Sequence, residues 1–126
     1  MKNTGLSLFI LYTIILLAAT LAPAEYVREA NVFKFSDKFM HLISFGVWSG
    51  CLYLLFVFFG TGESFRNSSL SILWGTLFGA LIEVLQITLP VYRSFEYADI
   101  LADFIGALLF VLALSWIIKT KKSTLF

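Results

Sequence analysis

The chain has 126 residues, of which 60% are hydrophobic and 13% are charged, and its formal net charge is +1. Soluble domains are typically about 45–50% apolar and about 25% charged, so this composition excludes an ordinary soluble enzyme and favours an integral membrane protein. The near-neutral charge, without a basic patch interleaved with aromatic residues, gives no sign of a nucleic-acid partner. Membrane lipids are therefore the expected surroundings.

Four apolar segments are long enough to cross a hydrocarbon core of about 30 Å. Segments of this length satisfy their own backbone hydrogen bonds as α-helices, and the period-2 alternation of membrane strands is absent. The expected helices cover roughly residues 6–21, 40–60, 70–89 and 98–118. They leave little chain for anything else, which predicts an all-α integral membrane protein: one domain, residues 1–126, forming a compact four-transmembrane-helix bundle.

The first segment resembles a secretory signal peptide, because a lysine and an apolar run precede the small-residue triplet Ala22-Pro23-Ala24. The apolar run is somewhat long for a signal, so we interpret it as a retained membrane helix. The single cysteine, Cys51, lies in the middle of the second segment and excludes an intramolecular disulfide. Its simplest role is packing.

Lysine and arginine counts predict the topology. With four spans, the N-terminus, the second loop and the C-terminal tail share one side, which carries Lys2, Arg66, Lys119, Lys121 and Lys122. The other side carries Arg28, Lys34, Lys38 and Arg93, diluted by Glu25, Glu29, Asp37, Glu96 and Asp99. The positive-inside rule then favours both termini in the cytoplasm.

Polar residues interrupt three of the spans, and all of them fall near the same side of the membrane. Lys38 and His41 begin the second span, Glu83 and Gln86 lie late in the third, and Asp99 and Asp103 lie early in the fourth. Residues three or four apart share a helix face, as each of these pairs does. A charged residue at the centre of a membrane helix costs about 2.5–3.5 kcal/mol on insertion scales, so partners are expected. We predict that the three polar faces meet.

An alternative reading is structural. On that reading, Asp37, Lys38, Arg93 and Glu96 are ordinary residues of the membrane interface, and the helix-interior group only holds the helices in register. Arg93 has a specific predicted partner, either Glu83 or Asp99, because all three lie near the same span ends.

The spacing of these residues resembles a known family. Asp37-Lys38-x-x-His41-x-x-x-Phe45, then Glu83-x-x-Gln86, Arg93 and Asp99-x-x-x-Asp103-x-x-Gly106, is similar to the VanZ-like family of small bacterial membrane proteins. The likeness runs from about residue 37 to residue 106. One departure is Asp103, where the family pattern usually has Asn, so that an additional titratable group stands here.

The resemblance implies a multi-pass protein of the bacterial cell membrane, within the cell envelope. The family's namesake is associated with low-level resistance to the glycopeptide antibiotic teicoplanin, although such families contain many members outside resistance clusters. The envelope location therefore carries over to this chain more safely than antibiotic resistance does.

The expected chemistry comes from the side chains themselves. Bases can bind a phosphate or carboxylate of a lipid-linked or cell-wall precursor headgroup, while a carboxylate or the imidazole exchanges protons. We assign catalytic roles to Glu83, Asp99 and His41 if a reaction occurs, and substrate-binding roles to Lys38, Gln86, Arg93 and Asp103. Ser44 is the one nearby nucleophile, and a helix serine at that spacing is more often a packing residue.

No cofactor is expected, because a Gly-rich phosphate loop is absent. A metal is not expected either: the sequence lacks H-E-x-x-H and D-x-D spacings, and the neighbouring lysine and arginine would oppose a cation. A structural or regulatory membrane partner remains an alternative. A proton-coupled transporter subunit is another, but the far halves of the spans, such as residues 54–59 and 109–118, look nearly free of polar groups and predict a closed pocket.

Overall fold

The computed structural model describes residues 2–21, 34–60, 64–88 and 97–125. They form four helices: α1 (Lys2–Thr20), α3 (Lys34–Phe58), α4 (Ser64–Thr88) and α5 (Tyr97–Leu125). Each is long and apolar enough to cross a membrane, and the described residues contain no strand. The all-α, four-transmembrane-helix prediction is thereby confirmed.

The helices extend beyond the predicted apolar spans. Both α3 and α4 begin about six residues earlier than expected, and α5 continues to Leu125. A hydropathy scan detects only the part of a helix that meets hydrocarbon, whereas the backbone continues its hydrogen bonding into the polar interface. At its other end α3 stops at Phe58, and in the turn that follows Gly60 has a φ of 67°, which suits glycine, and its N–H donates to the Val57 carbonyl at 3.1 Å.

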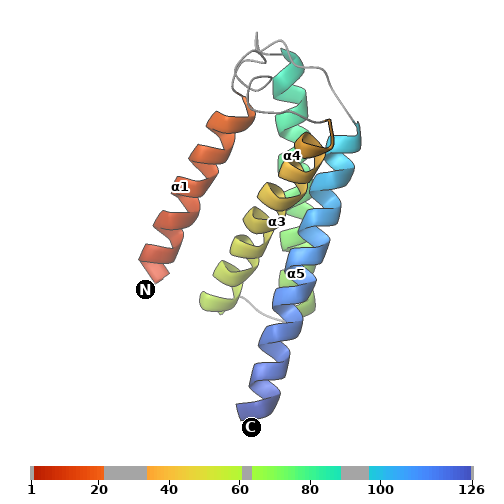
Figure 1. Cartoon of the computed structure of the whole chain (residues 1–126). Helices are drawn as coiled ribbons and strands as arrows, with labels where there is room; N and C mark the ends of the chain where they lie inside the picture. The colour runs from red at the N-terminus through yellow and green to blue at the C-terminus, as the bar shows by residue number, and fades with distance from the viewer. Residues whose placement is uncertain (1, 22–33, 61–63, 89–96, 126) are drawn as a thin grey trace.

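Successive helices alternate in direction, so the N-terminal end of α1 and the C-terminal end of α5 point to the same end of the bundle (Figure 1). Helices α3, α4 and α5 pack on one another, with the α3–α5 interface the most extensive, and α1 lies to one side against α3 and α4. The polar residues near the starts of α3 and α5 and near the end of α4 are therefore gathered at the end opposite the termini.

The apolar core lies where α1 meets α3 and α4. Trp48 and Phe78 stack with ring centroids 4.7 Å apart, and Phe9 of α1 reaches the Trp48 ring at 5.2 Å. Leu16 is buried in the same cluster. Two hydrogen bonds join α1 to α3: Tyr12 donates to the Ser44 carbonyl at 2.8 Å, and the Trp48 indole donates to the Thr13 hydroxyl at 2.9 Å. Helix α1 thus packs as part of the bundle.

A second, polar interface lies between α3, α4 and α5. Small and polar residues are buried there, every four positions along α4 and four or eight positions apart along α3 and α5, and we name this interface the polar seam. It comprises His41 and Ser49 of α3, Asn67, Ser71, Gly75, Gly79 and Glu83 of α4, and Asp99, Asp103, Ala107 and Ser115 of α5.

Close helix approach explains the small residues of the polar seam. A Cβ atom on Gly75 would collide with the Ser49 side chain, and one on Gly79 would collide with the Asp103 carboxylate. Beside the seam, a Cβ on Gly106 would overlap the backbone carbonyl of Leu42. Because lipid supplies little hydrophobic force between helices, such close packing is a main source of their association.

The seam continues into the far halves of the helices, where α4 buries Asn67, Ser68 and Ser71 and α5 buries Ser115. Only Ser71 and Ser115 of these lie within the predicted spans, whose far halves were expected to be nearly free of polar groups. Hydropathy averages hide these residues, because a few small polar side chains on one face barely change the mean of an otherwise apolar segment.

Candidate functional site

A charged cluster, formed by Lys38, His41, Glu83, Asp99 and Asp103, occupies one end of the polar seam. Its members come from three helices, with the lysine and histidine on α3, the glutamate on α4 and the two aspartates on α5. Asp103 lies six residues into α5, which is roughly 9 Å along the helix axis. The predicted meeting of the three polar faces is therefore what the structure shows.

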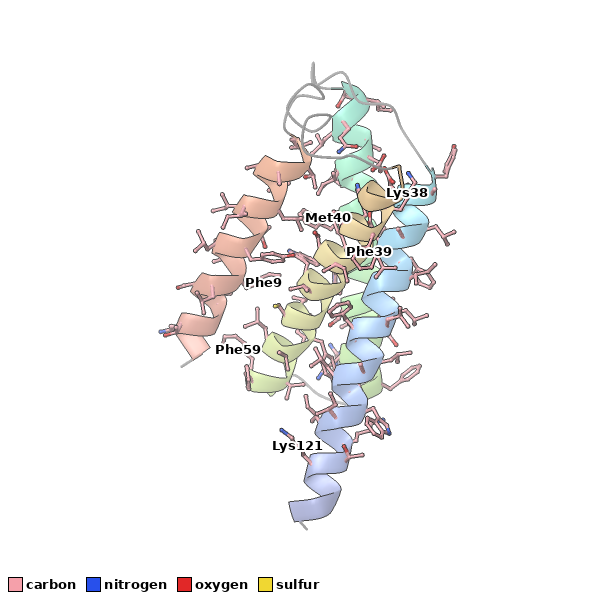
Figure 2. The ribbon with its side chains drawn as sticks, in the orientation of Figure 1. Phe9, Lys38, Phe39, Met40, Phe59 and Lys121 are labelled. Atoms are coloured by element: carbon pink, nitrogen blue, oxygen red, sulfur yellow. The ribbon has the colours of Figure 1, made fainter. Side chains whose placement is uncertain are left out.

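Lys38 and Asp99 form the outermost contact of the charged cluster. The Lys38 Nζ donates to Asp99 Oδ1 at 2.6 Å and joins α3 to α5. The two partners differ in exposure: 31% of the lysine side chain is accessible, against 6% of the aspartate side chain. In Figure 2, Lys38 lies near the end of the bundle away from the termini. A buried carboxylate is thus neutralised by a base that solvent or headgroups can reach.

His41 occupies the next layer inward and contacts both aspartates. Its Nδ1 lies 3.0 Å from Asp103 Oδ1, and its Nε2 lies 3.7 Å from Asp99 Oδ2. The direction of the contact with Asp103 depends on the tautomer of the histidine, and when Asp103 is ionised the Nδ1–H donates to it, because an ionised carboxylate only accepts hydrogen bonds. The ring also stacks on Phe45, one turn along α3, with centroids 5.6 Å apart. The orientation of the imidazole is therefore fixed on two sides.

Glu83 completes the charged cluster from α4. It is fully buried, and one of its oxygens lies within 4.8 Å of ligand atoms of both His41 and Asp99. Three potential metal ligands thus converge from three helices. Motifs such as H-E-x-x-H and D-x-D place all their metal ligands in one segment. Their absence from the sequence therefore says nothing about ligands that come from separate helices.

Gln86 has a different neighbour. Its Nε2 donates to the backbone carbonyl of Thr20 at 2.6 Å, joining α4 to the last residue of α1. Carbonyls at a helix end have no partner within the helix, so the amide satisfies one of them. Gln86 therefore ties α1 to the rest of the bundle, and its predicted contact with a substrate stays a prediction.

Three side chains that the sequence singled out lie outside what the structure describes. Arg93 and Glu96 belong to the segment 89–96, and Asp37 lies in α3 but its side chain is not described. The predicted pairing of Arg93 with Glu83 or Asp99 remains a prediction. Sequence reasoning also missed Ser49, Asn67, Ser71 and Ser115, although the four-residue spacing from Asn67 through the two glycines to Glu83 was a readable signal.

The charged cluster lies within a part of the chain that matches a protein-family model. The model of the VanZ/LLP1 family matches residues 9–119. The chain belongs to the VanZ/LLP1 family. The match covers α1 to α5, including every member of the charged cluster, so the resemblance expected from three spaced motifs is confirmed. Neither the curated proteins nor the solved structures contain a significant match to this VanZ/LLP1 chain.

Proposed function

We propose that this VanZ/LLP1 protein binds the anionic headgroup of a phospholipid or of a lipid-linked cell-wall precursor in the bacterial cell membrane. The observation that carries the proposal is the Lys38–Asp99 pair, in which an accessible ammonium group lies on a buried carboxylate at the end of the bundle. A phosphate oxygen arriving from the headgroup region can accept a hydrogen bond from the same ammonium. His41, one turn deeper, is placed to exchange a proton with the bound group.

Native mass spectrometry of the purified protein tests this proposal. The lipids are phosphatidylglycerol, a polyprenyl phosphate and zwitterionic phosphatidylcholine, and the variant is Lys38→Gln. A hydrogen bond to a charged group contributes about 1.5–3 kcal/mol, so the substitution should weaken binding of the anionic lipids about tenfold or more. The two anionic lipids distinguish a bulk phospholipid from a lipid-linked carrier.

Lys121→Gln is the matched control, because Lys121 is an exposed lysine near the opposite end of α5 (Figure 2). It should leave binding of the anionic lipids unchanged. Equal binding by Lys38→Gln and the wild-type protein, or equal affinity for phosphatidylcholine and the anionic lipids, would overturn the proposal.

A structural role is the second candidate, favoured by the way that the charged cluster joins α3 to α5. The two roles predict different results for Glu83→Gln and Asp99→Asn, which keep side-chain shape but remove a charge. If the charged cluster is a binding site, an envelope phenotype of the wild-type gene is lost while the protein remains abundant in the membrane. If it only fixes helix register, membrane abundance falls in parallel. Asp103→Asn should be mild, since it restores the residue usual in the family.

A proton-coupled transporter subunit is a third candidate, because the polar seam continues beyond the charged cluster. Ser49 is fully buried, and its hydroxyl oxygen has no hydrogen-bond partner among the described residues. The seam is interrupted, however, by the fully buried apolar side chains Phe45 and Val111. Proton flux into proteoliposomes loaded with a pH-sensitive dye would support transport, and its absence favours the headgroup site.

A further inference from the structure

We propose that His41, Glu83 and Asp99 form a binding site for a divalent transition-metal ion, of the Zn²⁺ or Mn²⁺ class. The inference concerns the same charged cluster as the headgroup proposal, and metal binding itself does not depend on that proposal. It rests on the geometry of three ligands, on the orientation of the histidine and on the different neighbours of the two Asp99 oxygens.

The first feature is the short distance between the possible ligand atoms of the three residues. One atom each from His41, Glu83 and Asp99 lies within 4.8 Å of the other two. Ligands bound about 2.0–2.2 Å from a tetrahedral Zn²⁺ lie roughly 3.4 Å apart, so the three atoms need to converge by an ångström or slightly more. His41 Nε2 and Asp99 Oδ2 are 3.7 Å apart. Side-chain rotation alone covers movements of this size.

The orientation of His41 is the second argument. Metal-bound histidines almost always donate their other ring N–H to a carboxylate or a carbonyl, and this bond fixes the tautomer and aims the free nitrogen at the metal. Here Nδ1 lies 3.0 Å from Asp103 Oδ1, the contact that such an outer bond requires, and Nε2 lies on the side of the ring that faces Asp99, 3.7 Å from Oδ2. Asp103 itself is fully buried and is a positioning residue in this arrangement.

The third feature is that the two oxygens of Asp99 have different neighbours. The lysine was expected to oppose a cation, but its Nζ binds Oδ1 of Asp99, whereas Oδ2 is the oxygen that faces the histidine. One carboxylate can therefore serve the lysine and the metal together.

The donor set determines the class of metal. One imidazole nitrogen and two carboxylates suit Zn²⁺ or Mn²⁺ better than Ca²⁺, which takes 6–8 oxygen ligands, or Mg²⁺, which keeps several waters. Three protein ligands leave coordination positions open. If the headgroup proposal also holds, an open position offers the phosphate a second contact beside Lys38.

Metal binding is measured on protein that is purified without a histidine tag, stripped with a chelator and dialysed against Zn²⁺ or Mn²⁺. Elemental analysis should give about one ion per chain, and Mg²⁺ and Ca²⁺ in excess should not displace it. Co²⁺ replacement should add a visible absorption band that reports nitrogen and oxygen ligands. Glu83→Gln and His41→Gln should each lower affinity for the ion by at least tenfold, whereas Lys121→Gln should not.

Asp103 provides a second test with a conservative rescue. Loss of such an outer partner typically lowers metal affinity 10–100-fold, so Asp103→Ala should bind the ion weakly. Asp103→Asn keeps a carbonyl oxygen for the Nδ1 proton and should retain most of the affinity. Circular dichroism and gel filtration confirm that each variant is folded.

Wild-type protein that binds no more metal than folded Glu83→Gln would overturn the metal site. Repeating the lipid measurement with and without chelator separates the two proposals. Metal binding without selective binding of anionic lipids contradicts the headgroup proposal alone. Selective lipid binding by a protein that takes up no metal contradicts the metal site alone.

Discussion

At the scale of single residues, the charged cluster shows how a membrane protein keeps carboxylates inside a bundle. Asp99 is paired with Lys38, and Asp103 with His41. The outer pair is asymmetric, because the lysine side chain is partly exposed and the aspartate is buried. The two partners should therefore differ in how much stability each substitution removes.

We expect Lys38→Met to destabilise the protein more than Asp99→Asn. In Lys38→Met the buried Asp99 loses its ammonium partner, and the more distant His41 imidazole is the basic group that remains beside it among the described residues. In Asp99→Asn the partly exposed lysine can turn toward water, so less stability is lost. A double-mutant cycle in mixed micelles, measured by denaturation with an ionic detergent, should give a coupling of about 1–2 kcal/mol, between the values for exposed and buried pairs.

Lys121→Met is the control for the loss of a lysine without a described carboxylate partner, and its effect on the free energy of unfolding should be close to zero. A Lys38→Met variant as stable as Lys121→Met would show that the pair contributes nothing to the fold.

At the scale of helices, close packing of α3 on α5 sets where the cluster residues lie. Gly106 permits the approach, since a Cβ there would overlap the Leu42 backbone, which cannot move aside as a flexible side chain does. Gly5 of α1 is different: a Cβ there would make an ordinary 3.7 Å contact with Leu55. The two glycines thus form a matched pair of sites for the same substitution.

We expect Gly106→Ala to lower the free energy of unfolding by about 1–3 kcal/mol or more, the usual cost of overpacking. Gly5→Ala should be neutral or stabilising by up to about 1 kcal/mol, because alanine is the better helix former. Thermal unfolding followed by fluorescence-detected gel filtration compares them. An equal loss of stability at both positions would argue against the tight crossing of α3 and α5.

At the scale of the whole molecule, the four helices place the charged cluster at the end opposite both termini (Figure 1). The orientation of this bundle in the membrane decides which leaflet supplies the headgroup. The three lysines near the C-terminal end of α5 predict cytoplasmic termini, which would direct the charged cluster outward.

Cysteine labelling in a Cys51→Ser background tests this orientation. A membrane-impermeant thiol reagent should label a cysteine at position 32 in intact cells and one at position 120 only after lysis. The reverse pattern would place the charged cluster at the cytoplasmic leaflet and would move the search for a ligand to that side.

The sequence by itself determined that the chain lies in a membrane, how many helices cross it and which polar helix faces meet. Hydropathy identifies a membrane span locally, and the three- and four-residue spacing of Lys38 and His41, or of Asp99 and Asp103, places them on one helix face regardless of the rest of the chain. The family resemblance also followed from these spacings, because most of its motif residues lie within single helices.

Only the tertiary structure decided which side chains contact each other. Spacing fixes the direction of a side chain on its own helix, but the rotation and the axial offset between helices come from packing such as Gly106 against Leu42. That packing pairs Lys38 with Asp99, turns Gln86 toward α1 and brings Glu83 beside His41. The three possible metal ligands lie on separate helices, and their convergence therefore has no signature in any one segment of the sequence.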